Sequence, residues 1–264
     1  MSASPTSSLT AHLLSLDEAG VKQATQHPFL WSAGSLTISN DALSAWLTQD
    51  RLYAMCGYTR LMGNMIARMH VPEQDPDSAA CREWKQTFTT LSGALSNIHR
   101  EINFFETTAA RYGLSVSRRP SSSSESLDLL NPITRGYIDY MASLSSHGSH
   151  AECAVLLWAM EELYLRAWTY ARTHLPSPST AEQEAGQIQP NPGAADEAGS
   201  ESVELSLRTF IHNWTSDEFQ AFVRDCKAIV ERLPQHEREG DNLARLEKVW
   251  RTVLWYEQRF WDAK

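Results

Sequence analysis

Apolar side chains recur at helical spacing along most of this chain, and strand-like alternation is hard to find. Glycine is scarce, with 12 residues, and most of the 11 prolines fall between the periodic segments, where they separate helices. We therefore expect an all-α protein. The predicted helices span residues 9–25, 40–70, 78–113, 131–145, 149–174, 202–213, 216–233 and 239–262.

Two stretches interrupt the helical pattern. Residues 115–128 include a run of four serines, and residues 175–201 are rich in Pro, Ser, Ala, Gln and Gly. Neither stretch holds enough apolar surface to offset the entropy lost on ordering. We expect both to be mobile insertions in a single helical domain that spans residues 1–264, and the second has the alternative interpretation of a regulatory linker.

The charge balance narrows the range of partners. The chain has 23 Lys and Arg against 32 Asp and Glu, a net charge of −9, which argues against nucleic acid or an anionic membrane as a partner. No stretch approaches the roughly 18 apolar residues of a membrane span, and residues 1–10 lack the apolar centre of a signal peptide. We expect a cytoplasmic protein.

The four cysteines are scattered singly, at Cys56, Cys81, Cys153 and Cys226. Their spacing matches neither a zinc site nor a disulfide scaffold, so we interpret them as reduced thiols. The chain also lacks a phosphate-binding glycine loop, a Gly-x-Ser-x-Gly motif and a His-Glu-x-x-His motif. Any chemistry must therefore come from side chains that are distant in the sequence.

Three acidic residues lie on the apolar faces of three predicted helices: Asp50, Glu161 and Glu257. Each has apolar or aromatic neighbours at helical spacing, as Trp46 and Tyr53 flank Asp50. Glu162, which follows Glu161, has Arg166 four residues later, a pair typical of a helix surface. Glu161 is thus the better candidate for an interior position.

A carboxylate in apolar surroundings costs several kcal/mol unless it is protonated, hydrogen-bonded or paired. For each acid alone, the alternative to a functional role is an ordinary partner for a buried Arg, a hydroxyl or a helix end. If the three converge on one cavity, desolvation and mutual repulsion separate their pKa values. Such a cavity would supply one general acid and one general base for hydrolysis, and the neighbouring aromatic side chains would stack on a flat ring.

Seven short segments, in their order and spacing, are typical of one protein family: His27–Leu30, Trp46–Tyr53, Ile102–Phe105, Tyr137–Tyr140, Trp158–Tyr164, Trp214–Phe219 and Tyr256–Trp261. On these segments the sequence resembles the TenA family, haem-oxygenase-like helical proteins of thiamin pyrimidine salvage. The resemblance covers nearly the whole chain apart from the two insertions.

The resemblance implies a single-domain helical bundle with a central pocket for an aminopyrimidine. Hydrolysis would cleave an exocyclic C–N or formamide bond without a metal or haem cofactor, and the family forms homo-oligomers, dimers or tetramers. In this resemblance Asp50 corresponds to the aspartate that holds the pyrimidine, and Tyr53 and Tyr137 correspond to pocket tyrosines. Glu257 corresponds to a late glutamate that acts as acid and base.

One departure from the family pattern bears on the mechanism. The larger branch carries a cysteine nucleophile in a Pro-Cys-x-Trp motif, whereas this chain reads Leu-Trp-Ala-Met-Glu over residues 157–161. The chain thereby resembles the cysteine-lacking TenA_E branch, in which a glutamate on this helix, here Glu161, takes a place in the pocket. Trp214 stands where many relatives have a tyrosine, and Tyr164 completes the expected substrate-binding set.

Without a thiolate, direct attack by a carboxylate-activated water is the simpler mechanism. We expect Asp50 to bind the ring nitrogen and the exocyclic amine. One of Glu161 and Glu257 would deprotonate water and the other would protonate the leaving nitrogen, and the sequence leaves the assignment open.

Two alternatives stay open. The first is a non-catalytic or repurposed binding protein that keeps the pocket but not turnover. The second is a di-iron oxygenase of the same architecture, for which His99, Glu101 and Glu106 on one predicted helix and Glu161 on another are the candidate ligands. No second helix carries a Glu/His pair at the required spacing on an apolar face, which weighs against the di-iron alternative.

Overall fold

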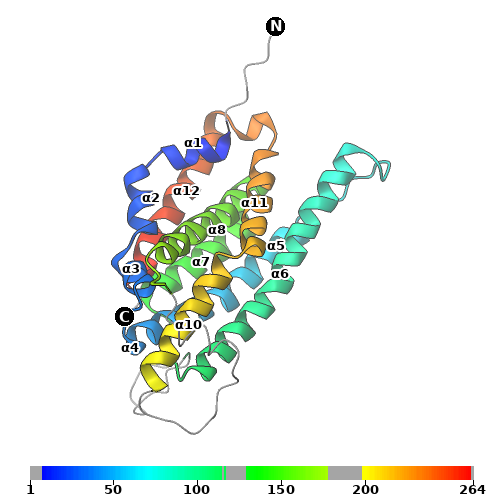
Figure 1. Cartoon of the computed structure of the whole chain (residues 1–264). Coiled ribbons are helices and arrows are strands. Elements are labelled where there is room, and N and C mark those ends of the chain that lie inside the picture. Colours follow the sequence, from blue (N-terminus) through cyan, green and yellow to red (C-terminus); the bar gives the residue numbers. More distant parts are fainter. Residues whose placement is uncertain (1–7, 115, 117–128, 178–197, 263–264) are drawn as a thin grey trace.

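The computed structural model describes residues 8–114, 116, 129–177 and 198–262, and those residues form helices and connecting turns without any strand (Figure 1). This confirms the all-α prediction. The elements in chain order are α1 Leu9–Ser15, α2 Glu18–Thr25, α3 Pro28–Gly34, α4 Asn40–Tyr53, a π turn η1 Ala54–Tyr58, α5 Thr59–Ala67, α6 Ala79–Arg111, α7 Pro132–His147, α8 His150–Thr173, α10 Ala198–Trp214, α11 Asp217–Glu231, a 3₁₀ turn η2 Gln235–Glu237 and α12 Gly240–Phe260.

The N-terminal region differs from the sequence prediction. Two helices replace the single helix expected at 9–25, because the Asp17 carboxylate accepts a hydrogen bond from the Gly20 N–H (2.8 Å) and caps a new helix. The short helix α3 was not predicted. It begins where His27 Nδ1 accepts a hydrogen bond from the Phe29 N–H (3.2 Å) and Pro28 occupies the first turn.

Another difference lies within the predicted helix at 40–70. The π turn separates α4 from α5, and α5 ends at Ala67. A π turn adds one residue to a helical turn, which changes the direction of the side chains that follow it. Gly57 allows this turn to approach α7 closely, because a Cβ at this position would overlap the end of the Met141 side chain.

Helix α8 is the centre of the bundle and contacts α2, α3, α10, α11 and α12 (Figure 1). A capping box of Ser149 and Glu152 starts it, and every side chain from Cys153 to Glu161 is buried. A helix that is apolar on all faces belongs in the interior of a bundle. The long helix α6 runs along the outside of the bundle and contacts α5 and α11.

The buried apolar side chains form one continuous core that includes Trp46, Trp158, Trp168 and Trp250. The expected insertions at 115–128 and 175–201 lie almost entirely outside the described residues. Within the described part of the chain, none of the helices is both long enough and apolar enough to cross a bilayer.

Candidate active site

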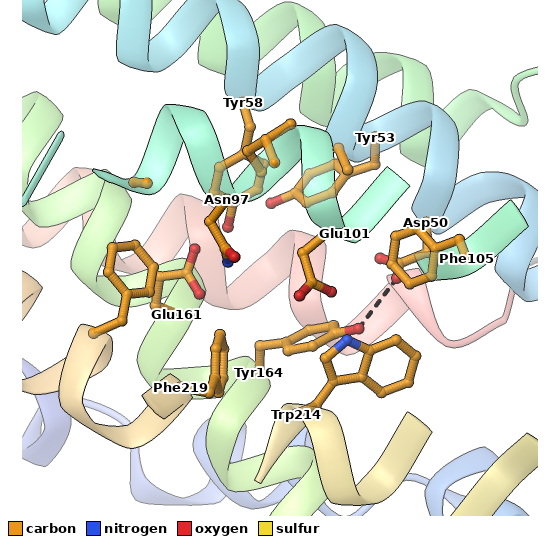
Figure 2. Close-up of a pocket in the computed structure, with 14 residues that line it drawn as sticks. Asp50, Tyr53, Tyr58, Asn97, Glu101, Phe105, Glu161, Tyr164, Trp214 and Phe219 are labelled. Atoms are coloured by element: carbon orange, nitrogen blue, oxygen red, sulfur yellow. Dashed lines mark hydrogen bonds between the residues drawn. The ribbon is translucent and has the colours of Figure 1, made fainter. Parts of the chain in front are cut away.

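A pocket lies where α4, the π turn, α6, α8, α10 and α11 meet. It contains about 610 Å³ of atom-free space, including the part that opens to solvent. Three carboxylic acids line it, and each comes from a different helix: Asp50 from α4, Glu101 from α6 and Glu161 from α8. Figure 2 shows these three carboxyl groups around the same space.

Asp50 is 4% exposed, and its Oδ2 accepts a hydrogen bond from the Tyr164 hydroxyl (3.1 Å). Burial raises the pKa of Asp50 to about 8; the Tyr164 hydrogen bond opposes this shift, and the negative charges of Glu101 and Glu161 add to it. Asp50 is therefore mostly protonated near neutral pH. A cationic group bound beside it would favour its ionised form.

Glu161 is 5% exposed on the central helix. Burial raises its pKa to about 7; a hydrogen bond to Tyr58 lowers it and the charge of Glu101 raises it. A carboxyl group with a pKa near the working pH is suited to general base catalysis.

Glu101 was not predicted as a pocket residue of a hydrolase. Its two carboxyl oxygens each lie 3.2 Å from the Asn213 amide nitrogen, which donates to them from α10. Burial raises its pKa, and the hydrogen bonds of Asn213 and Trp214 lower it. The sequence did carry a signal, since Ile98 and Phe105 flank Glu101 at helical spacing and line the same pocket.

Aromatic side chains form most of the remaining wall: Tyr53, Tyr58, Phe105, Tyr164, Trp214, Phe219 and Phe222. Trp214 is supported from behind by Trp168, with 4.5 Å between ring centroids. The hydroxyl of Tyr53 is buried, and its ring lies 5.0 Å from that of Tyr137. Tyr58 reaches the pocket from the π turn, and helical periodicity gives no signal for such a turn.

Two predicted site residues do not line the pocket. Glu257 on α12 is 4% exposed, and its Oε1 accepts a hydrogen bond from the Tyr137 hydroxyl (2.8 Å). The ring of Tyr137 lies 5.0 Å from that of Tyr53, which does line the pocket. Burial raises the pKa of Glu257 to about 8; the Tyr137 hydrogen bond lowers it, and the charges of Asp50 and Glu161 raise it. Glu257 thus lies behind the aromatic wall of the pocket, but close enough for the charges of Asp50 and Glu161 to affect its pKa.

None of the four cysteines lines this pocket. Cys153 is buried, and this burial raises the pKa of its thiol to about 11. Cys56 is exposed, and neither residue lines the pocket.

Of the four candidate ligands for a di-iron centre, Glu101 and Glu161 line the pocket, whereas His99 and Glu106 do not. Glu106 binds the Arg51 guanidinium (2.8 Å from Nε), and His99 lies beside the Asn103 amide (3.2 Å) on the exposed side of α6. Among the described residues, no three His, Cys, Asp or Glu side chains are placed to hold a metal ion.

Comparison with known proteins identifies the family. The model of the TENA/THI-4/PQQC family matches residues 17–264. A protein of Fusarium pseudograminearum (strain CS3096), described as a probable transcription factor, is 30% identical over 266 residues, which cover 94% of this chain and 50% of the relative. This chain therefore spans about half the length of that relative.

Two further relatives match over most of their length. A Glycine max protein, described as a probable bifunctional TENA-E protein, is 22% identical over 246 residues, 90% of this chain and 85% of the relative. The solved structure of a TenA homologue from Pyrococcus furiosus superposes with a TM-score of 0.71 at 21% identity, over 97% of this chain and 98% of that one. The chain belongs to the TENA/THI-4/PQQC family and has the fold of the TenA homologues.

Proposed function

We propose that this protein hydrolyses a C–N bond of a thiamin-derived aminopyrimidine with a carboxylate-activated water instead of a cysteine nucleophile. Membership of the family supports the general part of this proposal, a hydrolase of thiamin salvage. One observation carries the narrower proposal: three carboxylic acids from three helices, of which Asp50 and Glu161 are buried, surround a single cavity whose walls are largely aromatic.

The cavity suits a flat heterocycle that carries an amine. Its aromatic walls provide faces on which a ring can stack, and Asp50 with Tyr164 provides a polar pair for a ring nitrogen and an exocyclic amino group. The three acids favour a ligand that brings positive charge or several N–H donors.

Glu161 is the proposed general base, because its pKa of about 7 leaves it partly ionised at neutral pH. It takes one proton from a water molecule, the water oxygen bonds to the carbon, and protonated Glu161 passes this proton to the nitrogen as the C–N bond breaks. Glu257 would assist as a positioning residue through Tyr137 and Tyr53, because it does not reach the pocket itself.

Glu161→Gln tests the proposal. The wild-type protein should release ammonia from an aminopyrimidine, or formate from its formyl derivative. Glu161→Gln should reduce this rate by about 10²-fold or more, since general base catalysis contributes about 10² to 10⁴. The measurements are the rate of product release and the melting temperature of each variant, which shows whether the variant is folded.

Glu162→Gln is the matched control. Glu162 is adjacent in sequence, pairs with Arg166 (2.7 Å) and does not line the pocket, so its substitution should leave the rate within about twofold of wild type. A wild-type protein that binds aminopyrimidines but releases neither product would instead indicate the non-catalytic binding protein.

A further inference from the structure

Glu101 lines the pocket with Asp50 and Glu161, but the proposed hydrolysis gives it no role. Figure 2 shows its carboxyl group between those of Asp50 and Glu161. The charge of Glu101 raises the pKa of Asp50 more than the charge of Glu161 does, and it also raises the pKa of Glu161. Glu101 therefore lies between the two other acids, within electrostatic reach of both.

The groups that hold Glu101 differ from those that hold the other two acids. Its two oxygens each accept a hydrogen bond from the Asn213 amide (3.2 Å), and the Trp214 indole N–H also bonds to the carboxyl group. Amide and indole N–H groups can only donate, whereas the tyrosine hydroxyls at the other two acids can donate or accept. These donors favour an ionised carboxylate at Glu101 and oppose burial, which raises its pKa.

The pocket wall supplies acids but, among the described residues, no Lys, Arg or His. Arg100 is adjacent to Glu101 in sequence, but its side chain is 63% exposed and does not line the pocket. Its guanidinium binds Glu218 on α11 (2.8 Å) and Asn97 (2.6 Å). A positive charge inside the pocket beside Glu101 must therefore come from the ligand.

An amine on a saturated carbon of the substrate would provide this charge. Such an amine is protonated at neutral pH, as the Lys side chain is, with a pKa of about 10. If Asp50 and Tyr164 hold the ring nitrogen and the ring amine, the rest of the ligand extends past Glu101 towards Glu161 (Figure 2). The ammonium group and its C–N bond would then lie beside the Glu101 carboxylate.

We propose that Glu101 is a further catalytic residue, which binds the leaving nitrogen of the substrate as an ammonium group. The inference rests on the proposed function and adds a binding partner for the group that leaves. Glu161 accepts one proton from water, the water oxygen bonds to the carbon, and the C–N bond breaks with its electron pair on nitrogen. Protonated Glu161 gives its proton to the released ammonia. An alkylammonium ion and water thus yield an alcohol and an ammonium ion, and Glu101 stays ionised throughout.

Glu101→Gln tests the contact, because it removes the negative charge and keeps the shape of the side chain. The probes are two ligands: an aminopyrimidine that carries an aminomethyl group on the adjacent ring carbon, and the same molecule with a hydroxymethyl group in its place. The first ligand is cationic at neutral pH and the second is neutral. Dissociation constants are measured by calorimetry in a Glu161→Gln background, so that the aminomethyl ligand is not hydrolysed during the measurement.

We expect the Glu161→Gln protein to bind the aminomethyl ligand at least about tenfold more tightly than the hydroxymethyl ligand at pH 7, because hydrogen bonds between charged groups are the stronger ones. Adding Glu101→Gln should reduce this ratio to about twofold or less, and Glu101→Asp, which keeps the charge, should preserve part of it. Glu83→Gln is the matched control. Glu83 is an exposed residue of the same helix and does not line the pocket, so its substitution should leave the ratio unchanged.

A purely structural role of Glu101 would weaken the binding of both ligands equally, and that result, or an unchanged ratio, would overturn the contact. In an otherwise wild-type protein, Glu101→Gln should also lower kcat/KM for ammonia release by at least about tenfold. Ammonia release together with a ratio that does not respond to Glu101→Gln would refute the role of Glu101 and leave the proposed function intact. A ratio that responds, in a protein that releases no ammonia, would refute the hydrolase and keep the ammonium contact.

Discussion

At the scale of single residues, burial sets the protonation of the site. Asp50, Glu161 and Glu257 are each at most 5% exposed, and burial is the largest cause of their raised pKa values of about 8, 7 and 8. Tyrosine hydroxyls oppose these shifts: Tyr164 at Asp50, Tyr58 at Glu161 and Tyr137 at Glu257. Glu161 has the lowest of the three values and is the best suited to lose its proton near neutral pH.

The pH dependence of activity follows from Glu161. A general base acts in its ionised form, so kcat/KM should rise with pH through a midpoint near the Glu161 pKa of about 7. The measurement is kcat/KM from about pH 3 to pH 9 in a constant ionic-strength buffer. Glu162→Gln should keep this midpoint. A rise with its midpoint near the ordinary carboxyl range, about 4 to 5, would show that the base is not a buried carboxylate.

At the scale of elements, close helix approaches position the acids. Helix α3 packs against α8 at Gly34, where a Cβ would overlap the carbonyl oxygen of Ala171. The clash would be with backbone atoms, which cannot rotate away as a side chain can. On the other side of the pocket, Gly57 in the π turn lies against the end of the Met141 side chain of α7, which can move, and the next residue, Tyr58, lies beside Glu161.

Gly34→Ala should therefore destabilise the protein by about 1 to 3 kcal/mol, the cost typical of overpacking. Urea denaturation followed by tryptophan fluorescence measures the free energy of unfolding. Gly63→Ala should be neutral or stabilising by up to about 1 kcal/mol, since it replaces a helical glycine in open space. Equal stabilities for Gly34→Ala and wild type would show that α3 does not press on α8.

At the scale of the whole molecule, the buried acids make stability depend on pH. The folded-state pKa values of Asp50, Glu161 and Glu257 lie above the ordinary values of 3.8 for Asp and 4.5 for Glu. The folded protein thus keeps protons that the unfolded chain releases. The stability that these groups contribute is fully present below about pH 4 and is lost as the pH rises to about 8.

Asp50→Asn should remove part of the fall in stability that accompanies a rise in pH. Relative to wild type, its free energy of unfolding should increase by at least about 1 kcal/mol between pH 5 and pH 9, because one pKa unit corresponds to about 1.4 kcal/mol. Denaturation at the two pH values gives the difference. Asp41→Asn, an exposed residue of the same helix, should show no such change. A constant difference for Asp50→Asn would mean that its pKa is ordinary.

The helical class and two pocket acids were predictable from the sequence because both depend on local spacing. Residues three and four apart share a helix face, so Trp46 and Tyr53 around Asp50, and Leu157 and Leu165 around Glu161, place each acid on an apolar face without knowledge of the rest of the chain. The same rule applies to Glu101, between Ile98 and Phe105.

Only the tertiary structure decided which of these acids share a cavity. Glu101 and Glu257 both lie on apolar faces, yet Glu101 faces the pocket with Asp50 and Glu161, whereas Glu257 lies behind Tyr137. Spacing along a helix fixes the face of a side chain but not the helix that packs against that face. The packing depends on long-range approaches, such as Gly34 on α8, and on the added residue of the π turn, which interrupts the periodicity from which helices are predicted.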